Sequence, residues 1–267
     1  YENDTEAALK AETSPECLYA FSPLRENLFE WTEIQGDSRV LQIGSDYGSY
    51  TGLLARRAGE TVVLDPRDEN LEVNRLRHGT YGNLRFVRGD ILKPEAGYKE
   101  YKPGNGTAPL EFPGEGFDLI FMAGTLEQYK KEEAEAVLKA AAGLLKPEGT
   151  LYFAAENAAG GRYWMGAERF DVSFLRAEVL ELLESLEGTY GGSSLLYYPV
   201  PDYRYPAAVY SDAYLPENGE VTNISARLDG PGLTFGSEEQ AMAMACRNGV
   251  FSSFANSFLG AYRRGQS

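Results

Sequence analysis

The feature that most constrains this chain is an alternation of short apolar runs with helical stretches between residues 39 and 186. The runs have the length and composition of buried strands, and they lie at 39–43, 61–65, 84–87, 117–122 and 151–155. The helical stretches lie at 50–58, 68–77, 134–145 and 175–186. Such an alternation predicts a three-layer α/β/α domain, built on a doubly wound, mostly parallel sheet with right-handed crossovers.

The remaining segments set the expected domain boundaries. We expect a helical preface over residues 1–35, a core over 36–215 and a C-terminal extension over 216–267 that packs on the core. Residues 97–116 are rich in Gly and Pro, which predicts a surface loop. The last helix of the alternation is expected to end at Gly188.

Charge and hydropathy limit the partners. Acidic residues outnumber basic ones by 40 to 25, which gives a formal net charge of −15. A protein that binds nucleic acid needs a basic face to displace counterions, and this sequence shows none. No apolar run approaches the roughly 18 residues of a membrane span. We therefore expect neither nucleic acid nor a membrane as a partner.

The cysteines and the first residues bear on location. Cys17 and Cys246 are far apart in the sequence and fit no metal-ligand spacing, so we expect reduced thiols and no metal site. The first six residues are acidic and polar, where a secretory signal would be basic and then apolar. These features favour a cytoplasmic location.

The turn after the first strand restricts the ligand. In an open α/β sheet, ligands bind beyond the carboxyl ends of the strands. This turn holds Gly44 and Gly48, but Asp46 and Ser49 stand where a dinucleotide fingerprint has glycine. The Asp46 carboxylate would also repel a pyrophosphate. A dinucleotide-dependent oxidoreductase is therefore the weakest of the functions considered.

S-adenosylmethionine avoids that objection, because its sulfonium and ammonium groups tolerate nearby carboxylates. Asp65 ends the second strand about 20 residues after the turn, where a carboxylate can accept ribose hydroxyl protons, or it caps the next helix. Asp90 ends the third strand and can receive the adenine amino group, or it caps a turn. The small Ala123 and Gly124 end the fourth strand and leave room for a ligand. The candidate cofactor-binding residues are Gln42, Gly44, Ser45, Asp46, Gly48, Asp65, Pro66, Asp90, Ile91, Ala123 and Gly124.

Short segments spread along the chain carry a family resemblance, and they lie at 74–78, 81–84, 124–127, 145–149, 155–157, 162–167, 198–206, 210–216 and 254–259. With these segments, residues 40–157 resemble class I S-adenosylmethionine-dependent methyltransferases. Within that superfamily the chain looks like a bacterial group associated with glycosyltransferases and surface-polysaccharide genes. The resemblance implies a Rossmann-like class I methyltransferase fold with S-adenosylmethionine as the cofactor.

The resemblance also implies an activity, which is methyl transfer to a hydroxyl of a sugar, glycan or other small acceptor in polysaccharide biosynthesis. Two residues depart from the family pattern: Gln42 stands where an acidic residue is usual, and Asp46 stands where glycine is usual. Either the carboxylate has moved along the turn, or cofactor binding has been lost. In the second case the chain would be a catalytically silent fold that binds a glycosyltransferase.

A hydroxyl acceptor needs a general base, and three acidic residues are the candidates for that role. They are Glu127, Glu156 and Asp202, each of which has a plain alternative as a solvated or structurally paired carboxylate. The tyrosine-rich stretch 197–205 is expected to form a half-buried sheet edge, or alternatively an acceptor surface suited to sugar rings.

Overall fold

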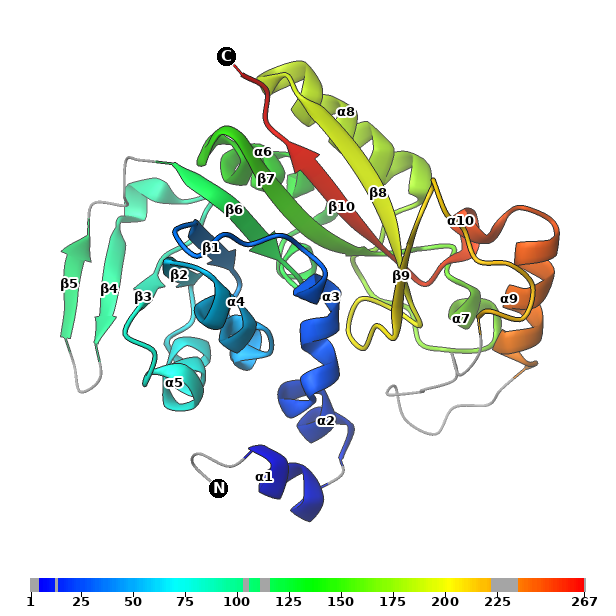
Figure 1. Cartoon of the computed structure of the whole chain (residues 1–267), viewed down its shortest axis with the longest axis horizontal. Helices are drawn as coiled ribbons and strands as arrows, with labels where there is room; N and C mark the ends of the chain where they lie inside the picture. The colour runs from blue at the N-terminus through cyan, green and yellow to red at the C-terminus, as the bar shows by residue number, and fades with distance from the viewer. Residues whose placement is uncertain (1–4, 13, 103–105, 111–115, 222–234, 267) are drawn as a thin grey trace.

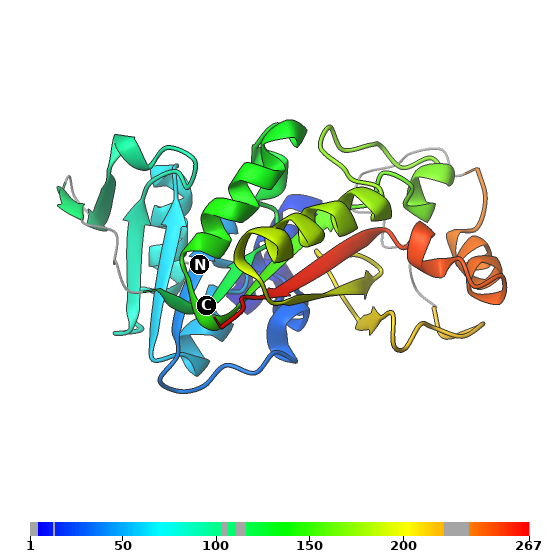
Figure 2. The ribbon, with the colours of Figure 1, turned by 90° about the horizontal axis from the view of Figure 1, so that it is seen from above.

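The described part of the chain builds one ten-stranded sheet with helices on both faces (Figures 1 and 2). The computed structural model describes residues 5–12, 14–102, 106–110, 116–221 and 235–266. The strands are β1 (Arg39–Ile43), β2 (Glu60–Asp65), β3 (Leu84–Arg88), β4 (Tyr98–Lys102), β5 (Gly106–Leu110), β6 (Phe117–Met122), β7 (Leu145–Glu156), β8 (Ser193–Val200), β9 (Ala208–Ser211) and β10 (Ser257–Arg263).

The sheet order is β5-β4-β3-β2-β1-β6-β7-β10-β8-β9. The central strands β3, β2, β1, β6 and β7 run parallel, which confirms the core predicted from the sequence. Antiparallel strands extend the sheet on both sides, with β4 and β5 beyond β3, and β10, β8 and β9 beyond β7. The carboxyl ends of the parallel strands therefore share one edge of the sheet.

Helices on the two faces complete the three layers. Helices α6 (Ala134–Gly143) and α8 (Arg176–Tyr190) pack on the side of β7, β8 and β10, whereas α4 (Thr51–Arg57) and α5 (Asp68–His78) lie on the opposite face (Figure 2). Successive strand residues point to opposite faces. Val40 thus packs with α4 in one core cluster, while Leu41 packs with α6 and α8 in another.

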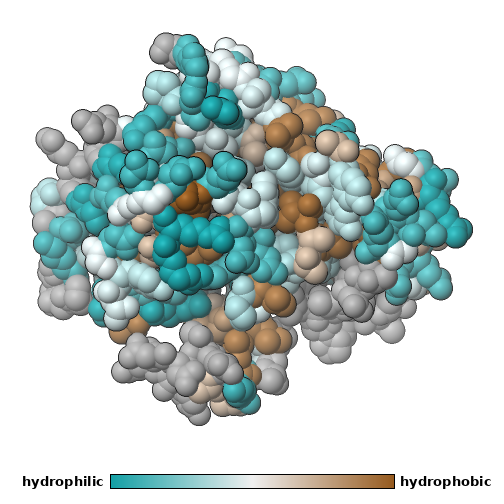
Figure 3. Space-filling view, in the orientation of Figure 1, coloured by the Kyte–Doolittle hydropathy of each residue, from teal (hydrophilic) through white to brown (hydrophobic). Residues whose placement is uncertain are grey.

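Short helices make up the preface and the connections. The preface holds α1 (Thr5–Ala11), α2 (Pro15–Phe21), η1 (Pro23–Glu26) and α3 (Asn27–Glu30). The connections hold η2 (Asp46–Gly48), η3 (Pro94–Ala96), η4 (Leu126–Gln128), η5 (Lys131–Glu133), α7 (Gly161–Trp164), α9 (Glu238–Arg247) and α10 (Phe251–Phe254). Apolar surface gathers over the preface helices in the lower centre of Figure 3, and the exposed Leu24 and Trp31 belong to this segment.

The expectation of a surface loop over residues 97–116 is wrong for its described part. Strands β4 and β5 form an antiparallel pair there and extend the sheet beyond β3. Pro109 lies in β5, which is an edge strand. Proline has no backbone N–H and is tolerated at a sheet edge, because one side of an edge strand has no neighbouring strand to bond. The Gly and Pro content hid an edge hairpin.

Helix α8 also runs past its expected end. Gly188 lies within the helix, which continues to Tyr190 and stops at Gly191. Gly191 has a φ of +67°, a left-handed conformation that favours glycine, whereas Gly188 has no such φ. The backbone conformation, rather than the first glycine in the sequence, ends the helix.

The C-terminal extension does more than pack on the core. Strand β10 lies inside the sheet, between β7 and β8, and six of its seven residues are buried. A boundary at residue 216 therefore divides one continuous sheet (Figure 1). The run 257–263 is interrupted by Gly260, so its strand character did not stand out in the sequence. Within the part of the chain that the structure describes, every helix is too short or too polar to cross a membrane.

Candidate functional site

The turn after β1 has a backbone that glycine makes possible. Gly44 has a φ of +86°, and a Cβ there would lie 2.5 Å from the Thr125 Oγ1 atom. Gly48 also has a positive φ, and between the two glycines Asp46 and Tyr47 adopt left-handed φ values of +42° and +53°. Such values are costly for residues other than glycine, so this turn is held by its surroundings.

Gln42 is one of the groups that hold the turn. Its Nε2 donates to the carbonyl oxygens of Gly44 and Ser45, at 3.0 and 3.2 Å. Its Oε1 accepts from the Thr51 hydroxyl at 2.7 Å, and the side chain is fully buried. In this arrangement Gln42 is occupied by the turn itself and by helix α4.

Asp65 lies at the end of β2 and is completely buried. Its Oδ2 accepts from the Ser45 backbone N–H at 2.8 Å and from the Asn70 side chain at 3.0 Å. Its Oδ1 accepts from the Arg67 backbone N–H at 2.8 Å. The carboxylate therefore ties the glycine turn to the start of α5. Its predicted contact with a ribose remains a prediction.

A cavity of about 430 Å³ opens at the carboxyl ends of β2, β3 and β6, and its lining residues are Pro66, Arg67, Asp90, Glu127, Gln128 and Tyr129. The Tyr129 hydroxyl donates to Asp90 Oδ1 at 2.9 Å. The Arg67 guanidinium donates to Gln128 Oε1 at 3.1 Å, which joins the β2 and β6 sides of the cavity. Ile91 is buried next to Asp90. The cavity thus brings together predicted residues from three strand ends.

Two tyrosine hydroxyls from distant segments face the end of β6. Ala123 is buried, and Gly124 has a φ of +69°. A Cβ on Gly124 would lie 3.5 Å from the Tyr19 hydroxyl and 4.0 Å from the Tyr203 hydroxyl. Tyr19 comes from α2 in the preface and Tyr203 follows β8, so the small residue at 124 is where the two segments meet.

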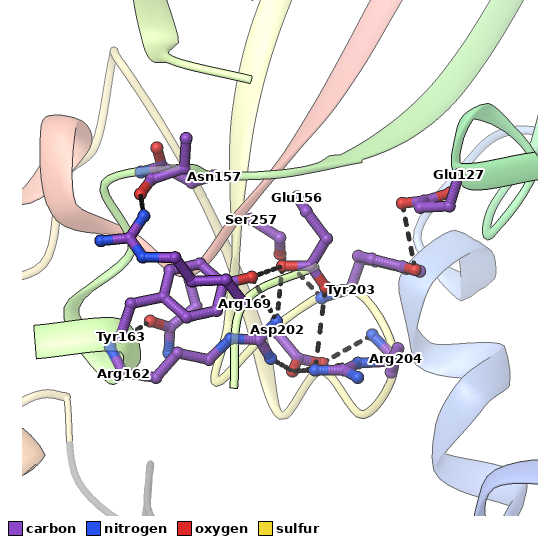
Figure 4. Close-up of polar contacts among 12 residues, drawn as sticks. Glu127, Glu156, Asn157, Arg162, Tyr163, Arg169, Asp202, Tyr203, Arg204 and Ser257 are labelled. Carbon is purple, nitrogen blue, oxygen red and sulfur yellow. Dashed lines mark hydrogen bonds and ion pairs between the residues drawn. The ribbon is translucent and has the colours of Figure 1, made fainter. Parts of the chain in front are cut away.

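A buried polar cluster lies beyond Tyr203 (Figure 4). The Arg162 guanidinium donates to Glu156 Oε2 at 2.6 Å and to Asp202 Oδ2 at 2.9 Å. Arg204 donates to Asp202 Oδ2 at 2.8 Å and lies 3.7 Å from Glu156 Oε1. Burial opposes ionisation of Asp202, but Arg204 and Arg162 outweigh it and lower the pKa of that carboxyl. Asp202 is therefore a structurally paired carboxylate in this arrangement.

Glu127 connects the cavity to that cluster. The Tyr203 hydroxyl donates to Glu127 Oε1 at 3.3 Å, as Figure 4 shows. The other carboxylate oxygen, Oε2, is buried and has no hydrogen-bond partner among the described residues. Burial, reinforced by the charge of Glu156, raises the pKa of Glu127 to about 8. Burial also raises the pKa of Glu156 to about 7, although Arg162 and Arg204 oppose it.

Sequence reasoning missed several residues of this region. Tyr129 lies far from Asp90 in the sequence, and only the fold brings its hydroxyl there. Arg162 and Arg204 stood in segments that carried the family resemblance, but nothing in their spacing showed that they pair with Glu156. Arg25, from the preface, forms an ion pair with Asp46, and no local pattern pointed to it.

Comparison with known proteins finds a family that matches the central part of the chain. A methyltransferase domain family matches residues 41–153, which span β1 to β7. Residues 41–153 are therefore similar to a methyltransferase domain. Two solved structures of similar fold hold S-adenosylhomocysteine, the demethylated form of the cofactor that the sequence predicted. The ten-stranded sheet has the Rossmann-like class I methyltransferase fold.

Individual relatives match only part of the chain. Phosphoethanolamine N-methyltransferase 1 of Arabidopsis thaliana is 29% identical over 114 residues, which are 43% of this chain and 20% of that protein. Ribosomal RNA small subunit methyltransferase A of Syntrophus aciditrophicus is 31% identical over 78 residues, 29% of this chain and 28% of that protein. The chain thus spans about one fifth of the first relative and just over a quarter of the second.

Solved structures match over most of the chain at low identity. The N-methyltransferase NodS of Bradyrhizobium japonicum, in complex with S-adenosylhomocysteine, has a TM-score of 0.51 at 15% identity and covers 99% of this chain and 100% of its own. The phosphoethanolamine N-methyltransferase 1 of Haemonchus contortus has a TM-score of 0.55 at 13% identity and covers 92% of this chain and 43% of its own. These likenesses concern the fold.

The residues at the strand ends fit such a cofactor. The cavity of about 430 Å³ lies within the range of small-molecule sites. It is lined by Asp90, a carboxylate suited to an adenine amino group. The unpartnered Glu127 Oε2 is a buried acceptor that a ligand could satisfy.

Proposed function

We propose that the protein is an S-adenosylmethionine-dependent methyltransferase that acts on a hydroxyl of a sugar or another small acceptor. The observation that carries this proposal is the position of Glu127. It lines the cavity with Pro66 and Asp90, and on its other side it contacts Tyr203 at the edge of the buried polar cluster. A base in that position borders the proposed cofactor site on one side and the Tyr203 side, where we place the acceptor, on the other.

The proposed roles follow from the contacts. Pro66, Asp90 and Ile91 would hold the adenosine part, and the turn 42–48 would hold the methionine part. When bound, the cofactor supplies an electrophilic methyl group on a positively charged sulfur. Glu127 would take the proton of the acceptor hydroxyl, and Tyr203 would orient the carboxylate through its hydrogen bond. A positive charge nearby favours the ionised carboxylate and so lowers the pKa of Glu127 from its value of about 8.

The charges around the buried cluster favour a neutral acceptor. A phosphorylated acceptor needs cations that can bind its phosphate. Arg162 and Arg204 are both paired with Glu156 and Asp202 instead. The cluster is therefore balanced in charge, which suits an uncharged sugar or other small molecule better than a phosphate ester.

Calorimetric titration with S-adenosylmethionine and S-adenosylhomocysteine tests the proposal, with NAD as the negative control. We expect micromolar binding of both and none of NAD. Asp90→Asn should weaken S-adenosylhomocysteine binding about ten-fold, the loss of one strong hydrogen bond. Asp68→Asn is the matched control, because the half-exposed Asp68 carboxylate pairs with Arg88 and does not line the cavity. Absence of binding to the parent protein would contradict the proposal.

A second candidate function rests on a different observation. The Asp65 carboxylate is already satisfied by three protein donors, and Asp46 is paired with Arg25. A methyltransferase fold whose cofactor groups are occupied in this way could serve only as a binding partner, for example of a glycosyltransferase. The same titration separates the two, because a silent fold would bind neither cofactor form.

A further inference from the structure

Two carboxylates at the ends of neighbouring strands each have one buried oxygen without a hydrogen-bond partner among the described residues. Glu127 lies five residues after the end of β6, and Glu156 is the last residue of β7. The unpartnered atoms are Glu127 Oε2 and Glu156 Oε1. A buried acceptor that stays unpaired loses its hydration without compensation, so each such atom needs a role in chemistry or toward a ligand. We call Glu127 and Glu156 the carboxylate pair.

The two members of the carboxylate pair have opposite surroundings (Figure 4). Arg162 donates to Glu156 Oε2 at 2.6 Å and Arg204 lies 3.7 Å from Oε1, so two cations stabilise the ionised form of Glu156. The Tyr203 hydroxyl donates to Glu127 at 3.3 Å, but no cation of the described chain pairs with that carboxylate. Like charges in one buried site oppose each other's ionisation. The negative charge of the pair therefore resides on Glu156, and the proton resides on Glu127.

The other charged and titratable groups around Glu127 come from several elements. They are Tyr19 of α2, Arg67 and Asp90 at the ends of β2 and β3, Tyr129 after η4, and Tyr203 and Arg204 after β8. The two cations in this set have other partners. Arg204 donates to Asp202 at 2.8 Å, and Arg67 lies 3.8 Å from Asp65. Neither supplies the positive charge that would ionise Glu127.

The segment that carries Glu127 borders both parts of the proposed cofactor site. Glu127 lines the cavity with Pro66 and Asp90, where we place the adenosine part. At the start of the same segment, the Thr125 hydroxyl donates to the Ile43 carbonyl oxygen at 2.6 Å, directly before the turn where we place the methionine part. The sulfur of the methyl donor joins these two parts. We therefore expect the positively charged sulfur beside the segment that carries Glu127.

We propose that Glu156 is a positioning residue that keeps Glu127 protonated until the sulfonium of the methyl donor binds, whereupon Glu127 releases its proton to the solvent. The carboxylate pair thereby distinguishes the charged donor from the product, which is a neutral thioether. The inference rests on the proposed function, because it assigns the charge state of the same base.

One turnover balances in atoms and in charge. The acceptor oxygen forms a bond to the methyl carbon, while the carbon–sulfur bond breaks and leaves its electron pair on sulfur. The proton of the acceptor hydroxyl passes to the ionised Glu127. Because the sulfur is then neutral, Glu127 keeps this proton, as it does in the empty protein. Glu127 releases the proton to the solvent when the next sulfonium binds.

Calorimetric titration in two buffers of different ionisation enthalpy counts the protons released on binding. At pH 7, one unit below the pKa of about 8, about nine tenths of the protein carries the Glu127 proton. S-adenosylmethionine should release about 0.5–0.9 proton more from the parent than from Glu127→Gln. S-adenosylhomocysteine should release equal numbers from both proteins. The comparison with Glu127→Gln removes the contribution of groups on the ligand itself.

Further variants test the role of Glu156. Glu156→Gln removes the like charge, lowers the pKa of Glu127 and should cut the extra proton release at pH 7 to about half or less. Glu156→Asp keeps the charge and should release more protons than Glu156→Gln. Tyr203→Phe acts in the opposite direction, because the lost hydrogen bond favoured the ionised carboxylate, and it should increase the release at pH 8. Glu132→Gln is the matched control, because Glu132 is exposed and lies outside the cavity, and it should behave as the parent.

The outcomes separate the inference from the proposed function. If S-adenosylmethionine binds but releases equal numbers of protons from the parent and from Glu127→Gln, the inference is wrong and the proposed function stands. If Glu156→Gln releases as many protons as Glu132→Gln, Glu156 has no positioning role. If Glu156→Gln does not fold, the parent, Glu127→Gln and Tyr203→Phe still decide whether Glu127 carries the proton. A parent that binds neither ligand overturns the proposed function as well.

Discussion

Replacing Asp65 by alanine should lower the stability of the folded protein, whether or not Asp65 also contacts a ligand. The substitution leaves three buried donors without an acceptor, the backbone N–H groups of Ser45 and Arg67 and the side chain of Asn70. At about 1 kcal/mol for each lost bond, the free energy of unfolding should fall by about 3 kcal/mol. For a domain of this size that corresponds to a drop in Tm of about 6–12 °C.

Thermal unfolding followed by circular dichroism measures this loss. Asp68→Ala is the matched control three residues later, because its carboxylate is half exposed and the change should cost less than 1 kcal/mol. Asp65→Asn keeps the size of the side chain and one acceptor oxygen, so its Tm should lie between those of the parent and Asp65→Ala. An Asp65→Ala protein that melts within 2 °C of the parent would refute the reasoning that this carboxylate ties the turn to α5.

Three other substitutions test the remaining contacts. Glu127→Gln addresses pH dependence: because burial raises the pKa of Glu127 from 4.5 to about 8, its contribution to stability is complete below about pH 4.5 and is lost as the pH rises through 8. The Tm of the parent should therefore fall more steeply between pH 5 and 8 than that of Glu127→Gln, and parallel slopes would contradict the shift. Arg162→Leu removes the ion-pair partner of the buried Glu156, so the free energy of unfolding measured in urea should fall by about 3–5 kcal/mol. Arg263→Leu is the control, because the ion pair of Arg263 with Glu148 is exposed and its loss should cost less than about 1 kcal/mol. Gly44→Ala should lower the free energy of unfolding by more than about 2 kcal/mol, because Gly44 has a φ of +86° and a Cβ there would collide with Thr125. Gly82→Ala is the control, because a Cβ at Gly82 meets open space, and its free energy of unfolding should stay within about 0.5 kcal/mol of the parent. Equal losses would show that the turn tolerates a side chain.

The parallel core could be predicted because its signals are local. An apolar run such as 117–122 or a helical period such as 134–145 is set by neighbouring residues, and the structure has β6 and α6 at those places. The edge strands could not be predicted in the same way. Strand β5 carries a glycine and a proline and exists through backbone pairing with β4, which the sequence does not display.

The candidate site shows the same division. The strand ends that carry Pro66, Asp90 and Glu127 were predicted, because a parallel sheet brings such ends together, and they line one cavity. The pairing of charges could not be predicted. Arg25 meets Asp46, and Arg162 meets Asp202, across 21 and 40 residues, so only the folded chain decides which carboxylates are free and which are paired.

The position of β10 has a consequence for how the protein is made. Among the described strands, β8 and β9 join the rest of the sheet only through β10, which is synthesised almost fifty residues after β9. Until residue 263 has left the ribosome, β7 and β8 each present an unpaired edge with apolar side chains to the cell. Open edges of this kind pair readily with other chains. A pause in translation before β10 is therefore expected to favour aggregation, and a chaperone that holds the nascent chain would act on this interval.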